Sequence, residues 1–514
     1  MHPKVLLDAC AELVRLTLTF EHPADAVVSR FFRDNRGLGP RERATLAETV
    51  YTVLRKKLLF DHMAPSGSGP KERRLAILGF YGPRDFLEGA LTDQERKWLD
   101  QCDGVTVDDL MERHRHNLPE WLVQPLKDQL GGEFWALVDS MNQAAPLDLR
   151  VNTLNDKRED VQKELKAAGL HAKSTPFSPW GLRLADKVPL TKFDAFSRGA
   201  IEVQDEGSQL LALLLDAKRG EMVVDFCAGA GGKTLAIGAS MRNTGRLYAF
   251  DTSAHRLDAL KPRLARSGLS NVHPAAIAHE RDDRIKRLSG KIDRVIVDAP
   301  CSGLGTLRRN PDLKWRQSPQ AVEEMTAKQA AILQSAARLL KPGGRLVYAT
   351  CSLLPQENEE IAQAFSAANP EFKLLPAFAE TLLLLTSSAT FGRATLAMKY
   401  DEPRRVLFGW LGATLGLGLV FLALEANDFA TMLAHGAYPM RSGFLSSFFA
   451  LVGLHGLHVA VACFWLVVML GQICAYGLDA RVRINLLRLG LFWHLLDIVW
   501  IAIFSVVYLQ GNIG

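Results

Sequence analysis

A change in composition near residue 375 divides this chain of 514 residues into two parts that must fold by different rules. Residues 376–514 hold only eight of the 61 Lys and Arg residues and seven of the 56 Asp and Glu residues. Their apolar runs are long enough to cross a lipid bilayer, whereas the first 375 residues are as rich in charge as soluble domains are. The sequence therefore predicts a soluble head followed by an α-helical membrane bundle at 376–514.

The head is only mildly basic, because residues 1–375 carry a net charge of +4 out of +5 for the whole chain. Charge alone therefore does not indicate that the head binds polyanions strongly. The seven cysteines lack the spacing of a disulfide framework or a zinc site, which favours a reducing compartment. The first residues, MHPKVLLDACAEL, do not resemble a secretory signal. We therefore expect a cytoplasmic head without a metal site.

Apolar residues recur at helical spacing throughout residues 1–140, with breaks at 37–40 and 64–70, and predict an all-α domain. Basic clusters accompany the helices at Arg41, Arg43, Arg55, Lys56, Lys57 and residues 71–74. They suit contact with RNA, but the solvated faces of ordinary helices look the same. Both interpretations stay open.

Residues 145–200 are predicted to form a small α+β insert, and residues 201–375 an α/β domain. The insert shows a strand at 147–154, a charged helix at 157–168 and short strands around 180–184. In the second domain, strands alternate with loops and helices several times. This alternation predicts a parallel, doubly wound, Rossmann-like sheet.

A glycine-rich loop, DFCAGAGGKT at 225–234, follows the first strand of that sheet. Glycines there let the backbone approach a ligand at the start of a helix, where amide groups point outward. Asp251 ends the next strand, where a carboxylate can hold a ribose hydroxyl pair. A plain glycine turn with a helix-capping Asp251 is the structural alternative. The spacing of a phosphate-binding P-loop is not met, which weakens the interpretation as a phosphoryl-transfer enzyme.

Two cysteines follow two further strands, Cys301 in DAPCSG and Cys351 in ATCSLL. The carboxyl ends of strands line the ligand crevice of such a sheet, so both thiols are expected to face one pocket. A thiolate adds to carbon 6 of a pyrimidine and makes carbon 5 nucleophilic enough to take a methyl group from a sulfonium donor. A second group must then help remove a proton and expel the enzyme. Two thiols suit that division of labour, although cysteine is also common as a small buried residue.

With these motifs, residues 1 to about 375 resemble the Sun/Fmu family of bacterial small-subunit ribosomal RNA 5-methylcytosine methyltransferases. The resemblance implies a helical RNA-binding domain, a small RNA-recognition insert and a class I methyltransferase fold, with S-adenosyl-L-methionine as cofactor and ribosomal RNA as partner. It also implies that Cys351 is the nucleophile and that Cys301 assists product release. The residues that it implies for the cofactor are Cys227, Ala228, Gly229, Ala230, Gly231, Gly232, Lys233, Asp251, Glu280 and Asp298.

Among these residues, Asp298 is expected near both cofactor and base, and Glu280 stands about where the family has an acid facing the adenine. The stretch Arg308 to Pro311 and Lys314 resemble the family's RNA-facing loop. Two departures accompany the match. Ala230 stands where the family usually has proline, and the final strand hairpin expected after residues 372–376 is missing, which leaves the sheet without its last strands and with an exposed edge.

The membrane region contains candidate helices at about 377–398, 406–424, 444–470 and 486–509, of which the last three are long enough to span. The segments RSGFLSSFFALVGLHGLHV and LFWHLLDIVWIAIFSVVYL resemble subunit III of bo-type quinol oxidases, a subunit of haem-copper oxidases that binds no haem or copper. The match covers only the later part of that subunit. Two pairs at one-face helical spacing, His455/His458 and His494/Asp497, are accordingly interpreted as packing and hydrogen-bonding residues.

Basic residues in the loops near 399–405 and 481–488 predict that both loops are cytoplasmic. If 377–398 spanned, the head would lie outside the cell, away from cofactor and ribosomal RNA. Our hypothesis is that this segment lies at the membrane interface, which gives three crossings and a cytoplasmic head on the inner membrane. A second hypothesis is that two reading frames are fused or misassembled near 374–380, where both family patterns break off.

Three functions remain in competition at this point. The leading one is methylation of RNA at carbon 5 of cytosine through a cysteine–RNA intermediate. The alternative is a membrane subunit III of a quinol or cytochrome oxidase, in contact with other oxidase subunits and carrying a vestigial or artefactual head. The third is RNA binding without catalysis, if the missing hairpin destroys the cofactor site.

Overall fold

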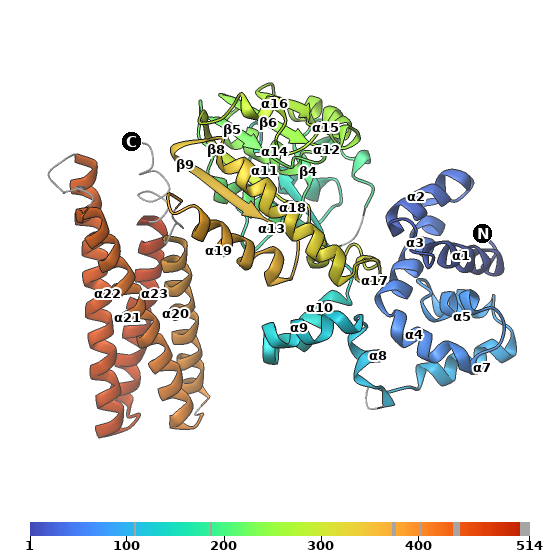
Figure 1. Cartoon of the computed structure of the whole chain (residues 1–514). Helices are drawn as coiled ribbons and strands as arrows, with labels where there is room; N and C mark the ends of the chain where they lie inside the picture. Colours follow the sequence, from blue (N-terminus) through green and yellow to red (C-terminus); the bar gives the residue numbers. More distant parts are fainter. Residues whose placement is uncertain (107–108, 186–187, 373–376, 401, 435–442, 504–514) are drawn as a thin grey trace. The chain divides into compact units, whose positions relative to one another are not determined.

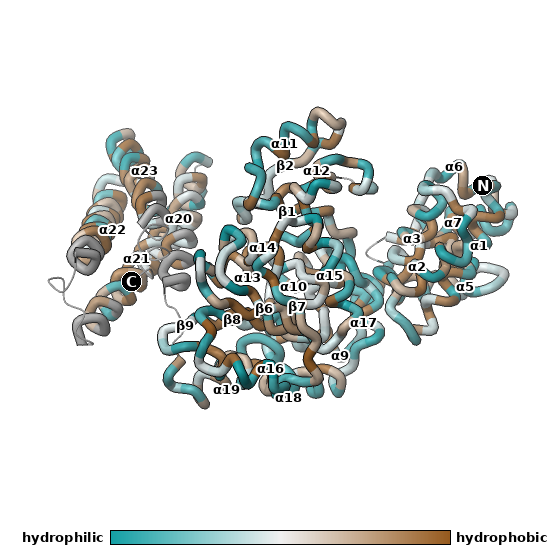
Figure 2. The backbone as a smooth tube through the Cα atoms, turned by 90° about the horizontal axis from the view of Figure 1, so that it is seen from above, coloured by the Kyte–Doolittle hydropathy of each residue, from teal (hydrophilic) through white to brown (hydrophobic). Residues whose placement is uncertain are grey.

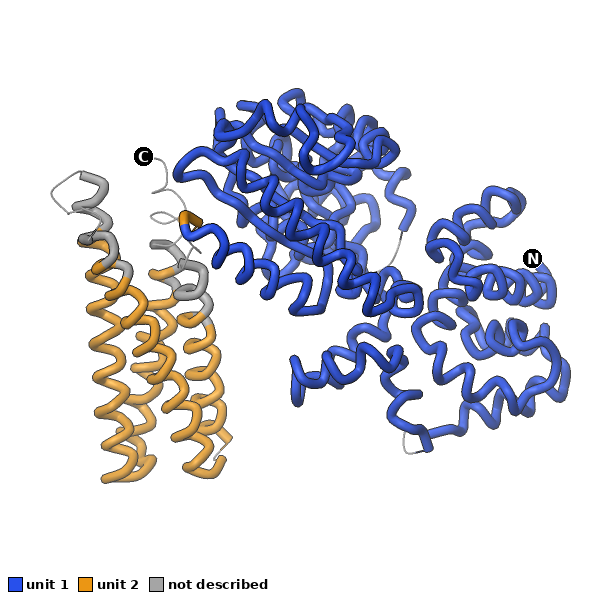
Figure 3. The backbone as a smooth tube through the Cα atoms, viewed as in Figure 1, with its two compact units in different colours: residues 1–370 blue, residues 371–514 orange. Residues whose placement is uncertain are grey.

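The computed structural model describes residues 1–106, 109–185, 188–372, 377–400, 402–434 and 443–503. The chain forms two compact units, Met1–Pro370 and Glu371–Gly514, which are coloured separately in Figure 3.

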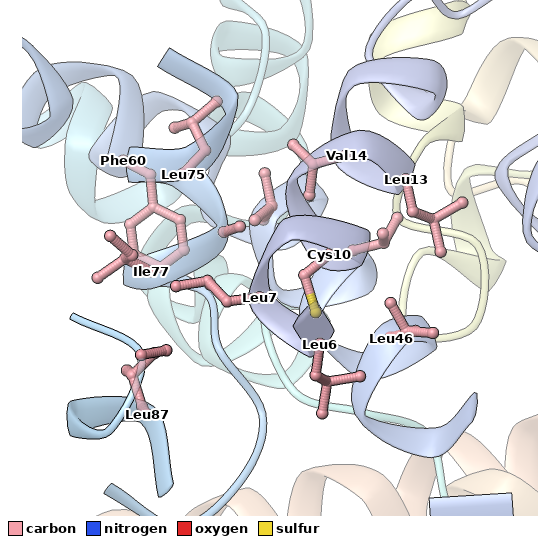
Figure 4. Packing of buried hydrophobic residues seen from close by; sticks show 14 of the residues in the cluster. Leu6, Leu7, Cys10, Leu13, Val14, Leu46, Phe60, Leu75, Ile77 and Leu87 are labelled. Carbon is pink, nitrogen blue, oxygen red and sulfur yellow. The ribbon is translucent and has the colours of Figure 1, made fainter. Parts of the chain in front are cut away.

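The amino-terminal part of the first unit is helical; the helices up to residue 103 bury their apolar faces around one core, and the helices between 120 and 141 pack in a second core. Figure 4 shows Cys10 of the first core among leucines that include Leu6, Leu7 and Leu13. Cys10 is fully buried, and burial raises its pKa to about 12, so it is a packing residue and not a nucleophile. The helices are α1 (Pro3–Thr17), α2 (Ala24–Asp34), α3 (Pro40–Arg55), α4 (Lys57–Met63), α5 (Lys71–Leu78), α6 (Arg84–Glu88), α7 (Asp93–Asp103), α8 (Glu112–His116), α9 (Glu120–Leu130) and α10 (Phe134–Met141).

A small antiparallel sheet follows, with the strand order β2-β3-β1-β4. The predicted first strand and charged helix are present, but β2 and β4 were not identified because three-residue strands carry too little periodicity. Leu149 in β1 pairs with Val203 in β4, and β4 is the last strand of this sheet before the next domain. The elements are β1 (Leu147–Val151), α11 (Arg158–Ala167), β2 (Ala172–Ser174), β3 (Gly181–Leu184), α12 (Asp194–Ser197) and β4 (Ile201–Val203).

The largest sheet is parallel throughout, with the order β7-β6-β5-β8-β9, which confirms the predicted Rossmann-like class (Figure 1). Alternate side chains of its strands face opposite layers of helices. Val223 and Ile296 pack with α13, α14 and α15, whereas Val224 and Val295 pack with α18 and α19. The strands are β5 (Met222–Asp225), β6 (Arg246–Asp251), β7 (Val272–Ala276), β8 (Ile292–Asp298) and β9 (Leu340–Ala349), and the helices are α13 (Glu206–Leu215), α14 (Gly232–Ser240), α15 (Ala254–Ser267), α16 (Asp283–Lys286), α17 (Leu313–Arg316), α18 (Pro319–Ala337) and α19 (Glu359–Ala368).

Strand β9 forms one edge of this sheet. It begins at Leu340, which pairs with Ile292 across an irregularity in the register. Within the described residues no strand pairs with its outer edge.

The second unit is a set of long helices, α20 (Ala377–Lys399), α21 (Arg404–Ala434), α22 (Gly443–Tyr476) and α23 (Ala480–Ile503), along which Figure 2 shows many apolar residues. Among the described residues, two stretches are long and apolar enough to cross a membrane, Arg404–Asn427 and Phe449–Tyr476. Helix α21 continues to Ala434, beyond the predicted loop start at 425, and the end of the last candidate helix, 504–509, lies outside the described residues. The exposed side chains of α22 include Leu457 and Phe464, an apolar surface that suits lipid.

Two histidines of this unit form hydrogen bonds within it. His455 contacts the carbonyl oxygen of Leu496 at 3.2 Å and lies beside the rings of Phe421 and Trp500. The ring of His494 bonds to Ser388 at 2.5 Å.

Candidate active site

A cleft of about 1240 Å³ opens where β5, β6 and β8 end. Parallel strands place their carboxyl ends at one edge of the sheet, so residues far apart in sequence converge there. Of the residues that the sequence singled out for cofactor or catalysis, all except Gly231 line this cleft.

The glycine-rich loop connects β5 to α14 and is held by its neighbours. Gly231 has φ +81°, and a Cβ atom there would come within 2.1 Å of the Leu260 side chain, so only glycine fits. The Asp251 carboxylate accepts hydrogen bonds from the backbone N–H of Gly229 (2.8 Å) and of Ser253 (2.7 Å). Asp251 therefore ties the loop to the end of β6, and its remaining lone pairs stay available for a ligand.

Charged side chains line the floor and wall of the cleft. Lys233 Nζ forms an ion pair with Asp298 Oδ2 at 2.6 Å and also contacts Ser208 Oγ at 3.5 Å. Glu280 lies on the wall after β7 and pairs with the neighbouring Arg281 at 3.6 Å. Asp298, the last residue of β8, is thus bonded to Lys233 at the end of the glycine-rich loop and precedes Cys301 by three residues.

The two cysteines meet in the cleft. Their sulfur atoms are 3.3 Å apart, and the backbone N–H of Cys351 also donates to Cys301 Sγ at 3.3 Å. A hydrogen bond from the Cys301 thiol lowers the pKa of Cys351, and the same bond, with burial, raises the pKa of Cys301. Cys351 is exposed whereas Cys301 is half-buried, so Cys351 is both the more accessible thiol and the one whose pKa is lowered.

Sequence reasoning missed the contribution of the residues at the end of the small sheet to this cleft. Gln204, which directly follows β4, lines it, is only 5% exposed and accepts a hydrogen bond from the buried Arg150 at 2.6 Å. Its amide nitrogen has no hydrogen-bond partner within the described part of the chain. The only sequence signal was a polar pair, Gln204-Asp205, after a short strand that periodicity did not identify.

The predicted RNA-facing loop is largely engaged within the head. Lys314 is 3% exposed and donates to the carbonyl oxygen of Arg55 at 2.9 Å, and burial lowers its pKa to about 7. Arg309 pairs with Asp205 at 2.8 Å, and Arg308 donates to the carbonyl oxygen of Ala144. The expectation that Lys314 faces RNA is therefore wrong, because the amino-terminal helices cover it.

Several basic residues of the helical domain are engaged as well. Arg55 is buried and donates to the carbonyl oxygen of Arg308 at 3.1 Å. Arg73 pairs with Glu95 and Asp8, and Lys57 with Asp61. Of the clusters that suited RNA, Arg41, Lys56 and Lys71 remain exposed.

Asp225, the last residue of β5, offers a test of the electrostatics under the cleft. It is 1% exposed, accepts a hydrogen bond from Thr234 at 2.7 Å, and burial raises its pKa from 3.8 to about 6. Below about pH 4 the carboxyl is protonated in both states, whereas above pH 6 the folded state holds a buried charge. Asp225→Asn should therefore raise the free energy of unfolding at pH 8 by up to about 3 kcal/mol, and by almost nothing at pH 4. Denaturation of both proteins at the two pH values checks this, and equal stability at pH 8 would contradict it.

Comparison with known proteins follows the same division of the chain. The family model described as 16S rRNA methyltransferase RsmB/F matches residues 212–398, and a ferredoxin-like domain model of RsmF/B-like methyltransferases matches residues 118–191. A probable ribosomal RNA small subunit methyltransferase B of Synechocystis is 31% identical over 398 residues, which cover 70% of this chain and 88% of the relative. Ribosomal RNA small subunit methyltransferase B of Klebsiella pneumoniae is 34% identical over 294 residues, 57% of this chain and 67% of the relative.

The crystal structure of PH0851 superimposes with a TM-score of 0.62 at 29% identity, over 73% of this chain and 92% of that one. At the other end, the model for cytochrome c oxidase subunit III matches residues 366–512. The methyltransferase and oxidase matches overlap at residues 366–398, which includes the predicted junction at 374–380.

Proposed function

Because the chain belongs to the 16S rRNA methyltransferase RsmB/F family, we propose that its head methylates carbon 5 of a cytosine in small-subunit ribosomal RNA, with S-adenosyl-L-methionine as the methyl donor. The observation that carries this proposal is the pair of thiols, 3.3 Å apart, in the cleft that the glycine-rich loop lines. One cleft thus contains a thiolate, a second thiol and a loop suited to close approach of a ligand.

The residues of the cleft fit the proposed cofactor. In the loop from Cys227 to Lys233, Gly229 and Gly232 line the cleft without a side chain, so the backbone there is open to a ligand, and Asp251 has lone pairs free for the ribose hydroxyls. The unpartnered amide of Gln204 supplies a buried donor suited to a carboxylate. When bound, S-adenosyl-L-methionine supplies an electrophilic methyl group. We assign Glu280 to the adenine side and Asp298 to the boundary between cofactor and base.

The two cysteines then divide the chemistry. Cys351 adds as a thiolate to carbon 6 of the cytosine, which forms a C–S bond and makes carbon 5 nucleophilic. After carbon 5 has taken the methyl group, Cys301 removes the proton from carbon 5. The electron pair of that C–H bond re-forms the ring double bond as the C–S bond breaks, and Cys351 leaves as a thiolate.

The hydrogen bond between the thiols explains how Cys301 becomes a base when it is needed. In the free enzyme, the pKa of Cys301 is raised chiefly by the bond that it donates to Cys351. Once Cys351 is bonded to carbon it is no longer a thiolate, and this cause is lost. The pKa of Cys301 should then fall, and Cys301 gives its proton to water before it takes, as a thiolate, the proton from carbon 5.

The experiment is methyl transfer from labelled S-adenosyl-L-methionine to small-subunit ribosomal RNA by the full-length protein, purified in detergent. We expect label in 5-methylcytidine after digestion of the RNA to nucleosides. Label in another nucleoside would contradict the proposed target. RNA binding without incorporation would favour a non-catalytic protein whose sheet lacks its last strands.

We also propose that the chain is organised as a helical domain at 1–140, an RNA-recognition insert at 145–200, a methyltransferase domain at 201–375 and a membrane region at 376–514. For the last region a second function has support from the subunit III match and from the two apolar stretches in α21 and α22. It would anchor the head to the cytoplasmic face of the inner membrane or join haem-bearing oxidase subunits.

Two measurements separate these possibilities. Protease treatment of inside-out and right-side-out vesicles locates the head, and protection of the head in inside-out vesicles would contradict a cytoplasmic position. Absorption spectra of the purified protein report haem, and absence of haem-bearing subunits from the purified complex would contradict oxidase assembly.

A further inference from the structure

We infer that Glu357 is a positioning residue that holds the two cysteine loops together; this inference rests on the proposed function and deepens it. Glu357 is the last residue of a short 3-10 turn, Pro355–Glu357, six positions after Cys351. Its side chain is completely buried and does not line the cleft, so it is out of reach of a ligand bound there. Any effect on the reaction must therefore pass through the groups that it binds.

The carboxylate of Glu357 gathers donors from the loop that carries the other cysteine. Its Oε1 accepts from the backbone N–H of Ser302 at 2.8 Å, and its Oε2 accepts from the Ser302 hydroxyl at 2.5 Å. Gln329 Nε2, on α18, also donates to Oε1 at 3.0 Å. Three donors thus meet at one side chain that only accepts, and two of them belong to the residue next to Cys301.

Further bonds extend this connection to both loops. Ser302 Oγ lies 3.1 Å from the hydroxyl of Ser352, the residue after Cys351. Gln329 also donates to the carbonyl oxygen of Pro300 at 3.0 Å, on the other side of Cys301. The backbone N–H of Gly305 donates to the carbonyl oxygen of Cys351 at 2.8 Å. Each cysteine is therefore flanked by bonded groups, and Glu357 accepts the largest number of these bonds.

This network fixes the distance between the sulfur atoms, which the proposed chemistry requires in a narrow range. Cys301 takes the proton from carbon 5 and Cys351 bonds to carbon 6 of the same ring, so a small shift of either loop would misalign one of these two steps. Loss of Glu357 would leave the N–H and hydroxyl of Ser302 without partners in a buried place, and the Cys301 loop would rearrange to satisfy them. Release of the product, which depends on Cys301, should suffer most.

The test compares Glu357→Ala with Glu357→Gln in methyl transfer to small-subunit ribosomal RNA. E357A should lower kcat by about 100-fold while KM for S-adenosyl-L-methionine stays nearly unchanged, and covalent RNA–protein adduct should accumulate. E357Q should recover most of kcat, because its carbonyl oxygen still accepts two bonds and its amide can donate to Ser302 Oγ. Loss of kcat in E357A without adduct, or with an equal rise in KM, would overturn the inference.

A matched control removes another buried hydrogen-bonded pair from the same layer. Asn369 pairs with Gln334 of α18 at 3.1 Å and touches neither cysteine loop. Asn369→Ala should therefore retain kcat within about twofold of wild type, since it leaves the site geometry intact. An adduct in N369A as abundant as in E357A would show general loosening and overturn the assigned role.

A second readout does not depend on methylation, so failure of the inference about Glu357 can be distinguished from failure of the proposed function. Diamide takes two hydrogen atoms from two neighbouring thiols and leaves a disulfide, which requires strict geometry. Peptide mass mapping should find a Cys301–Cys351 disulfide in wild type and E357Q, and one that forms roughly tenfold more slowly in E357A. Equal rates in all three proteins would overturn the inference even if the wild type proved inactive towards RNA.

Discussion

Replacing Cys351 with alanine is expected to lower methyl transfer to RNA by on the order of 10³-fold or more, with binding of S-adenosyl-L-methionine unchanged. Cys351 is the exposed member of the thiol pair, and the hydrogen bond from Cys301 lowers its pKa. Without a nucleophile at carbon 6, carbon 5 of cytosine is too poor in electrons to attack the methyl group. The measurement is the initial rate of label transfer with wild-type and variant protein at saturating cofactor.

Two further variants sharpen this prediction. Cys351→Ser should be almost as inactive as C351A, because a serine hydroxyl is a much weaker acid than a thiol and remains protonated. Cys474→Ser removes another exposed thiol, in α22, and should leave the rate unchanged. Turnover by C351A near the wild-type rate would reject Cys351 as the nucleophile.

That the site residues come together was predictable, because the strands that carry them all run in the same direction. Asp251, Asp298 and Cys351 lie at or just beyond the ends of three apolar strands, and any parallel sheet brings such ends to one edge. The glycine-rich loop was readable for a similar local reason, since Gly231 has φ +81°, a conformation that residues with a Cβ atom rarely adopt. Neither inference needed knowledge of distant contacts.

The contacts that depend on packing between domains were not predictable. Lys314 and Arg55 resemble solvated basic residues in the sequence, yet each bonds to a backbone carbonyl of the other's segment and both are buried. Glu357 likewise looks like one of several acids in PQENEE, and only the fold brings it to Ser302, 55 residues earlier. Periodicity predicts which face of a helix or strand is buried, but not which polar groups will form hydrogen bonds with each other across the fold.

Replacing Cys301 with alanine should separate the two halves of the reaction. Methyl transfer in a single turnover should persist, while multiple turnover should fall by about 10²–10⁴-fold, the range for loss of a general acid or base. The carbon 5 proton then leaves only slowly, so the C–S bond to Cys351 is not broken. RNA should remain attached to the protein through SDS electrophoresis, with the label in the attached RNA.

Cys301→Ser distinguishes the two tasks assigned to this residue. A serine hydroxyl still donates a hydrogen bond to Cys351, but it is too weak an acid to become the base that takes the carbon 5 proton. Adduct should therefore form in C301S at nearly the wild-type rate near pH 7, and more slowly in C301A, where the pKa of Cys351 returns towards the ordinary thiol range. Raising the pH should remove this difference, because the rate of adduct formation follows the thiolate fraction. Release should fail in both variants at every pH. Normal multiple turnover in C301S would show that some other group removes the carbon 5 proton. Identical rates of adduct formation in C301S and C301A at pH 7 would show that the 3.3 Å contact between the thiols does not activate Cys351.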